Sequence, residues 1–325
     1  MRRCLLLVCL GAWANTAFAG FVIGDVFASV GSGLVREFTP TGTLVQTLNT
    51  GTNSTFTAGS AFDAAGDLLV TTFASNVVSK FDVNGTLING GFAGGFVTDP
   101  ESITIAQNQN MFVGQADGTH QVREFSTSGS SGTLIATFSP AIESRGTDWI
   151  DLAADQHTLY YTSEGRFVHL FDTATNTQLA NLNSVALPSA NAFALRILAN
   201  GGVLVADADR IVQLDATGAI VRQYTTANTF SGHALSTLFA LNLDPDGTTF
   251  WTGDLGTGTI YRVNISTGAL ITSFSAGSGT LGGLSVFGEI TQGGGGGGGT
   301  ATPEPSSLVP LALMAIGAVV WRRGG

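Results

Sequence analysis

Val35-Arg-Glu-Phe-Thr-Pro-Thr-Gly42-Thr-Leu44 and Val78-Ser-Lys-Phe-Asp-Val-Asn-Gly85-Thr-Leu87 are two copies of one pattern. Each copy predicts an alternating strand, a polar turn and the start of a second strand. The turn position takes Gly or Asn because its backbone needs a positive φ. The pattern returns four more times, at Val122–Gly129, Val168–Asn176, Ile211–Ile220 and Ile260–Leu270. Its turn residue therefore recurs at positions 42, 85, 129, 176, 218 and 268, a period of about 45 residues.

A second hairpin precedes five of these six segments. The clearest is Ala61-Phe-Asp-Ala-Ala-Gly66-Asp-Leu-Leu-Val-Thr-Thr72, and its counterparts lie at 103–114, 150–162, 194–206 and 241–253. Four short strands in about 45 residues is the blade of a β-propeller. A sandwich of unrelated hairpins would not explain the steady period. We also expect short connections between the strands, made mostly of Gly, Ser, Thr and Ala.

The two ends of the repeat region determine how many blades there are. The first unit, Asp25–Leu48, lacks an innermost strand, whereas Leu281–Ile290 is a strand with no hairpin partner. Joining the two segments completes a sixth blade and hides both exposed strand edges. The sequence therefore predicts an all-β fold, a six-bladed β-propeller over residues 20–290 that is closed by N- and C-terminal strands.

Gly59-x-Ala-x-Asp-x-x-Gly-x-Leu-x-Val70 resembles the repeat of the NHL and related six-bladed propeller families. These motifs are degenerate. The resemblance therefore implies an architecture and no particular activity.

The first 19 residues are typical of a cleavable secretory signal peptide. Met1-Arg2-Arg3 is a basic start, an apolar core follows, and Ala17-Phe-Ala19 fits the small-x-small cleavage pattern, with Gly20 as the first mature residue. Both cysteines of the chain lie in this segment, so the mature protein has no disulfide and no thiolate metal site.

The other end carries a second export signal. Residues 291–302 form a glycine-rich linker, and residues 303–325 contain Pro303-Glu304-Pro305, an apolar run from Leu308 to Trp321, and Arg322-Arg323. This order resembles the PEP-CTERM sorting signal of Gram-negative bacteria. It implies export, transient anchoring in the inner membrane through a transmembrane helix, and processing by an exosortase-type protease. The apolar run has 14 residues, fewer than the roughly 20 that span a bilayer untilted, which favours a processed anchor over a permanent one. A GPI-type tail is the weaker alternative.

The charge of the mature region restricts its partners. Without the two terminal signals, 9 of the 13 basic residues and 22 of the 23 acidic residues remain, a net charge of −13. Lys80 is the only lysine. Such a surface argues against nucleic acid and against anionic lipid as partners, because both attract clusters of basic side chains.

Few residues are candidates for chemistry. No zinc, EF-hand or nucleophile-elbow motif occurs. The chain has four histidines, which are His120, His157, His169 and His233. None of them has a spacing typical of metal ligands. Trp149 and Trp251 could line a carbohydrate platform, but we expect them to pack in the core.

Polar residues at the starts of the innermost strands should converge on the channel of a propeller. Glu101, Asp148, Asn191 and Asn242 are at such positions. The set is similar to the site of the gluconolactonase family, which implies a divalent cation on Glu101, Asp148 and Asn191; oxygen ligands would suit Ca²⁺. The alternative is that Asp and Asn simply cap strand starts and turns.

Two classes of function remain open. The first is a non-enzymatic propeller of the cell surface or extracellular matrix, a binding or structural protein associated with exopolysaccharide or surface proteins. The second is a divalent-metal-dependent lactonase or hydrolase that uses the channel carboxylates. The sequence favours the first class.

Overall fold

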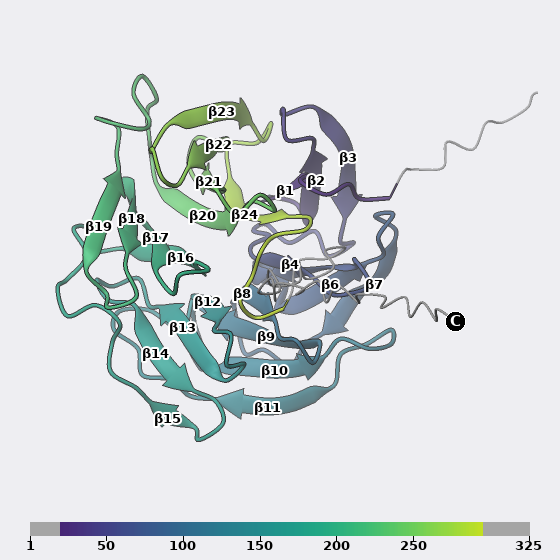
Figure 1. The fold of residues 1–325 in the computed structure, drawn as a ribbon. Helices are drawn as coiled ribbons and strands as arrows, with labels where there is room; N and C mark the ends of the chain where they lie inside the picture. Colours follow the sequence, from purple (N-terminus) through teal and green to yellow (C-terminus); the bar gives the residue numbers. More distant parts are fainter. Residues whose placement is uncertain (1–19, 295–325) are drawn as a thin grey trace, which may run out of the picture.

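The computed structural model describes residues 20–294, which form six four-stranded antiparallel sheets arranged in a ring (Figure 1). The predicted signal-cleavage residues Ala17 and Ala19 lie outside the described residues. So do the sorting residues, which are Pro303, Glu304, Pro305, Arg322 and Arg323. Within residues 20–294, no helix is long and apolar enough to span a bilayer.

The strands of each blade follow one another from the innermost, at the channel, to the outermost, at the rim of the ring. Blade I is β24 (Leu281–Val286), β1 (Val26–Val30), β2 (Leu34–Phe38) and β3 (Leu44–Asn49). Blade II is β4 (Ser60–Phe62), β5 (Leu68–Thr72), β6 (Val77–Phe81) and β7 (Leu87–Ala93), with a 3₁₀ turn at Phe73–Ser75. Blade III is β8 (Pro100–Ile105), β9 (Asn110–Gln115), β10 (Val122–Ser126) and β11 (Leu134–Phe138). Blade IV is β12 (Trp149–Leu152), β13 (Thr158–Thr162), β14 (His169–Asp172) and β15 (Thr177–Gln178). Blade V is β16 (Ala192–Ile197), β17 (Val203–Asp207), β18 (Arg210–Leu214) and β19 (Ile220–Tyr224). Blade VI is β20 (Leu238–Leu243), β21 (Thr249–Asp254), β22 (Thr259–Asn264) and β23 (Leu270–Ser275).

The strand pairing in blade I confirms the predicted closure of the ring. β24 pairs with β1 in antiparallel register, from Val26 opposite Val286 to Val30 opposite Leu281. The sequence predicts a strand that continues to Ile290, but the strand ends at Val286, because the chain turns at Gly288, where φ is +84°. The residues that follow leave the sheet and cross the channel.

Burial decreases from the inside of each blade to the outside. Every residue of β8, β16, β20 and β24 is buried, whereas β3 and β11 have one buried residue each. Inner strands carry apolar side chains on both faces because neighbouring blades cover both faces. Trp149 and Trp251 are buried among these side chains, which confirms that they pack in the core.

Glycine or asparagine has a positive φ at all six recurring turn positions, and these are Gly42, Gly85, Gly129, Asn176, Gly218 and Gly268. This agrees with the physical reason for their recurrence. The inner hairpins differ in one respect. Gln109 and Gln156 have φ of 68° at the turn of blades III and IV, where blade II has Gly66. Each glutamine Oε1 accepts a backbone N–H from the preceding blade, Ala64 at 2.7 Å and Gln107 at 2.8 Å. The bond between blades compensates for a conformation that glycine would adopt more easily.

Residues 287–294, hereafter the closing segment, cross the channel at the face where the innermost strands end. Figure 1 shows them in yellow, running from β24 across the centre of the ring toward β8. Glu289 is their main anchor: its Oε1 accepts from Arg196 Nε at 2.8 Å and from Leu243 N at 2.7 Å. Its Oε2 accepts from Asn242 Nδ2 at 2.9 Å. These bonds attach the closing segment to blades V and VI.

The same segment reaches the other four blades. The Phe287 N–H donates to Asp25 O in blade I, and the Phe287 ring lies 5.0 Å from the Phe62 ring of blade II. Gln156 Nε2 of blade IV donates to Gln292 O at 3.1 Å, and Gly294 forms a bridge with Ala106 after β8 of blade III. The closing segment therefore contacts all six blades, and it blocks one mouth of the channel.

Candidate functional site

Glu101 and Asp148 lie together at the opposite face, the entry face, where the innermost strands begin. Glu101 is the second residue of β8, and Asp148 directly precedes β12 in the adjacent blade. Their relative exposures are 1% and 0%, and the Glu101 carboxyl acts electrostatically on Asp148. Within residues 20–294, no hydrogen-bond donor reaches Glu101 Oε2 or either carboxylate oxygen of Asp148. Two buried carboxyl groups thus present three acceptor atoms that have no partner in this part of the chain.

Neither of the other two residues predicted for this site is hydrogen-bonded to the pair in the described chain. Asn191 is exposed and precedes β16, and no hydrogen bond joins it to Glu101 or Asp148 in the described chain. Asn242 lies within β20 and donates to Glu289 of the closing segment. The structure therefore brings together the two carboxylates of the predicted set and does not join the amides to them.

Charged residues from four loops surround the pair, and the sequence did not predict them. Arg145, which lies between β11 and β12, forms a bidentate pair with Asp117 at 2.6 and 3.1 Å and an ion pair with Glu164 at 2.9 Å. Asp99, at the start of blade III, interacts electrostatically with Asp117 and Arg145. These residues lie outside the repeated strand-turn-strand pattern, so no periodicity points to them. The available signal is their charge, which is unusual among loops rich in Gly, Ser and Thr.

Burial dominates the electrostatics of the central pair. Desolvation raises the pKa of Glu101 to about 8, opposed by the charge of Arg145 and reinforced by the surrounding carboxylates. Desolvation also raises the pKa of Asp148 to about 10, with Glu101 as the next contributor. In contrast, the hydrogen bonds from Arg145 lower the pKa of Asp117. Within the described chain, the site therefore has five carboxyl groups and one guanidinium, and that guanidinium is paired at the rim.

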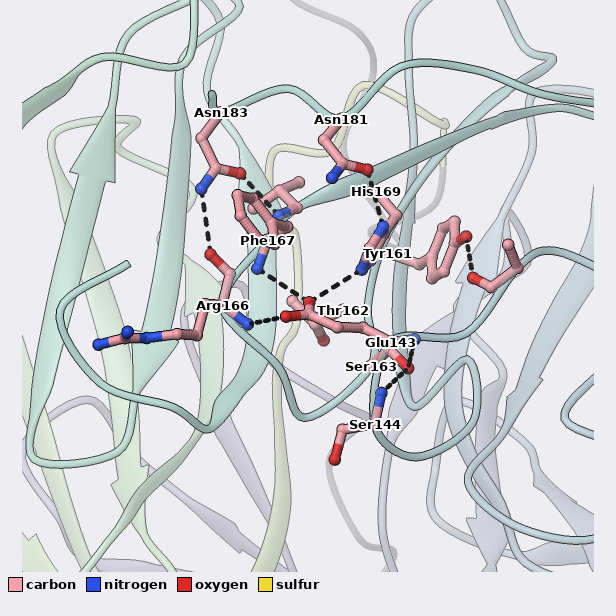
Figure 2. Close-up of polar contacts among 12 residues, drawn as sticks. Glu143, Ser144, Tyr161, Thr162, Ser163, Arg166, Phe167, His169, Asn181 and Asn183 are labelled. Atoms are coloured by element: carbon pink, nitrogen blue, oxygen red, sulfur yellow. Dashed lines mark hydrogen bonds and ion pairs between the residues drawn. The ribbon is translucent and has the colours of Figure 1, made fainter. Parts of the chain in front are cut away.

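The loop that carries Arg145 corrects the expectation of short connections made mostly of Gly, Ser, Thr and Ala. Residues 139–148 form a longer loop that Glu143 pins to blade IV (Figure 2). Glu143 Oε1 accepts from Arg166 N at 2.9 Å, and Oε2 accepts from Phe167 N at 3.1 Å and contacts His169 Nε2 at 3.2 Å. The Glu143 N–H donates to Ser163 Oγ at 2.9 Å. Two residues beyond this anchor, Arg145 is held in place beside the central pair.

Aromatic side chains form a wall next to the acidic cluster. Trp149, which follows Asp148, packs edge-on against Phe239 at 5.4 Å. Phe56 contacts Phe239 at 6.1 Å and Phe73 at 5.2 Å, and Arg145 Cζ lies 5.9 Å from the Phe73 ring. The entry face thus combines carboxylates with apolar rings, a setting in which a positive charge is favoured electrostatically.

The donor set for a divalent cation is incomplete in residues 20–294. Three or more His, Cys, Asp or Glu side chains nowhere gather closely enough there to hold a metal ion. Ca²⁺ takes six to eight oxygen ligands. Glu101 and Asp148 alone do not supply them, and the binding of Ca²⁺ at Glu101, Asp148 and Asn191 stays a prediction.

Comparison with solved structures supports the propeller fold. No family model and no curated protein matches the chain. One similar structure is a crystal structure of a nidogen/laminin complex, with a TM-score of 0.64 and 13% identity over 82% of this chain and 100% of that one. A protein of unknown function from Bacteroides caccae has a TM-score of 0.64 and 14% identity over 81% and 98%. The WD40 β-propeller domain of Doa1 has a TM-score of 0.56 and 14% identity over 80% and 81%. At these identities the likeness supports the six-bladed propeller fold alone.

Proposed function

We propose that this chain is an exported, non-enzymatic binding propeller of the cell surface or extracellular matrix, associated with exopolysaccharide and processed by an exosortase-type protease. The two terminal signals in the sequence support export and processing. The acidic, cysteine-free ring supports a binding or structural role outside the cell.

The closing segment is the observation that carries this proposal. It blocks the channel at the face from which the chain continues toward the linker and the apolar tail. A ring attached through this face would turn its closed mouth toward the attachment point. The entry face, with its charged and aromatic residues, would then be available to a partner. Such an arrangement suits a tethered binding module.

Mass spectrometry of the C-terminus tests the processing step. The chain would be expressed in a Gram-negative host with and without an exosortase. We expect a C-terminus upstream of Trp321 only in the strain with the protease. Replacing Pro303 and Pro305 by Ala should prevent the trimming, whereas Asp209→Ala, an exposed change in the ring, should leave it intact. An untrimmed wild-type chain in the presence of a protease that trims a known substrate would refute this part of the proposal.

Binding to exopolysaccharide is tested separately, with the trimmed protein and polysaccharide from the same cells. We expect co-sedimentation that survives moderate salt, since the ring's net negative charge offers little non-specific attraction to an acidic polymer. A protein that is processed but sediments no better than an unrelated acidic propeller would refute the association while leaving export intact.

A divalent-metal-dependent lactonase or hydrolase is the second candidate. The unpartnered oxygens of Glu101 and Asp148 favour it, and the incomplete ligand set within residues 20–294 opposes it. Ca²⁺-dependent thermal stabilisation together with lactone hydrolysis, both lost in Glu101→Gln and Asp148→Asn, would establish it over the purely binding role.

A further inference from the structure

The three unpartnered acceptors of the Glu101–Asp148 pair have the number and kind of atoms that one ammonium group satisfies. Buried polar atoms are almost always hydrogen-bonded, so three oxygens left without a donor by residues 20–294 require an explanation. A primary ammonium has three N–H donors and no acceptor. It would provide one donor for Glu101 Oε2 and one for each oxygen of Asp148.

The charges around the pair call for a cation that the described chain does not supply. Arg145 is the basic residue whose charge acts on both carboxyl groups of the pair. It is already bonded to Asp117 and Glu164. Lys80, the only lysine of the sequence, is buried in blade II, where its Nζ lies 2.9 Å from Asp63 and 3.0 Å from Asp67. An additional cation would therefore come from outside the ring.

The burial of the pair favours a slender ligand. Glu101 and Asp148 are almost fully buried, so the cationic group must lie at the end of a thin stem to reach them. The ammonium of an amino sugar is attached directly to a bulky ring, which would stop at the rim. A lysine side chain carries its ammonium on four methylenes, and such stems pack well along apolar surface such as that of the half-buried Phe73 ring.

We propose that the Glu101–Asp148 pair at the entry face binds the primary ammonium group of a lysine side chain from a partner protein. The inference deepens the proposed binding function and rests on it. It commits to a monovalent alkylammonium in place of a divalent metal ion, because two carboxylates match the donors of an ammonium and fall short of the ligands of Ca²⁺.

Binding should release protons. Without a cation, burial keeps the pair largely protonated at neutral pH. An ammonium favours the ionised form, so it would displace a proton from the pair. The other charged groups that face it are Asp99, Asp117, Arg145 and Glu164, with His120 next to Asp117. A purely structural contact would have no such proton linkage.

The test is isothermal titration of the purified protein with Nα-acetyl-lysine amide at pH 7 in two buffers of different ionisation enthalpy. The matched control is Nα-acetyl-norleucine amide, which has the same stem without the ammonium. Glucosamine and CaCl₂ complete the series. We expect saturable binding of the lysine probe with proton release, and binding at least tenfold weaker for norleucine, for glucosamine and for Ca²⁺.

The variant Glu101→Gln with Asp148→Asn should bind the lysine probe at least tenfold more weakly, and Asp209→Asn, an exposed change between β17 and β18 of blade V, should bind it as wild type does. Circular dichroism checks that each variant is folded. Should the double variant not fold, each single substitution serves in its place. Equal binding of lysine and norleucine probes, binding unchanged in the folded variants, or tight Ca²⁺ binding without lysine binding would each overturn the proposal. The processing and co-sedimentation results do not depend on this pair, so failure here is distinguishable from failure of the proposed function.

Discussion

Replacing Glu289 by Ala should weaken the whole ring, although the residue lies in an irregular segment after the last strand. Its carboxylate accepts three hydrogen bonds, from Arg196, Leu243 and Asn242, and connects two blades to the closing segment. The side chains of Arg196 and Glu289 are 8% and 7% exposed. The substitution would leave a buried guanidinium without its carboxylate partner.

The size of the effect follows from these contacts. Breaking one side of a buried ion pair costs about 3–5 kcal/mol, because the remaining charge stays desolvated. Asp151 also acts on the Arg196 charge, so the lower end of that range applies. We expect the free energy of unfolding to fall by about 3 kcal/mol. Glu289→Gln also leaves Arg196 without a counter-charge, but it keeps an acceptor for the Leu243 N–H and should therefore lose somewhat less than Glu289→Ala.

Urea unfolding followed by tryptophan fluorescence measures the loss, because Trp149 and Trp251 are buried in the ring. Asp209→Ala is the matched control: its partner Arg210 is close, but the Asp209 side chain is 62% exposed, and such pairs contribute about 0–1 kcal/mol. A Glu289→Ala protein that loses no more stability than this control would refute the view that the closing segment holds the ring together.

Three further predictions concern other parts of the ring. Burial raises the pKa values of Glu101 and Asp148 above their usual values near 4, so the folded state binds more protons than the unfolded state and the free energy of unfolding should fall as the pH rises from 4 to 8. The double amide variant should flatten this pH dependence, and an unchanged dependence in urea titrations would contradict the assignment. Gln109→Ala should lower the free energy of unfolding by about 1–2 kcal/mol, because it removes the hydrogen bond to the Ala64 N–H and leaves a side chain at a positive φ. Gln109→Gly should lower it less, because glycine adopts a positive φ without strain. Equal losses in thermal unfolding would count against this explanation. Lys80→Met should destabilise by about 3 kcal/mol, since two largely buried aspartates lose their counter-charge, and a neutral result in the same urea assay would show that they are solvated.

The architecture could be predicted from the sequence because the strand-turn-strand pattern of the blade recurs six times. The turn residue at 42, 85, 129, 176, 218 and 268 marks each blade, and the unpaired strand at the end accounts for closure. Blade IV is the weakest part of the repeat, and its outermost strand is only Thr177–Gln178. The sequence pattern of this strand is weak because only two residues of the blade pair at its outer edge.

The candidate site was only half predictable. Glu101 and Asp148 follow from a rule of the fold, since strand starts converge on the channel. Arg145 comes from a loop whose path depends on Glu143 and its contacts with 166–169, and that path has no periodic signature. The sequence places Glu289 in a strand, because an apolar alternation does not reveal where the chain leaves the sheet to cross the ring.

The closing segment also sets an order of events in the life of the chain. The partner of β1 is almost the last element of the ring to be synthesised, and the anchor Glu289 comes later still. Until then the blades can form one after another, but β1 keeps a bare edge and the assembly is an open arc. Contacts between such distant parts of the chain are slow to form. A chain interrupted before residue 281 would thus remain a row of blades with a free end, exposed to proteases and to neighbouring chains, and only a chain that includes β24 could become a circle.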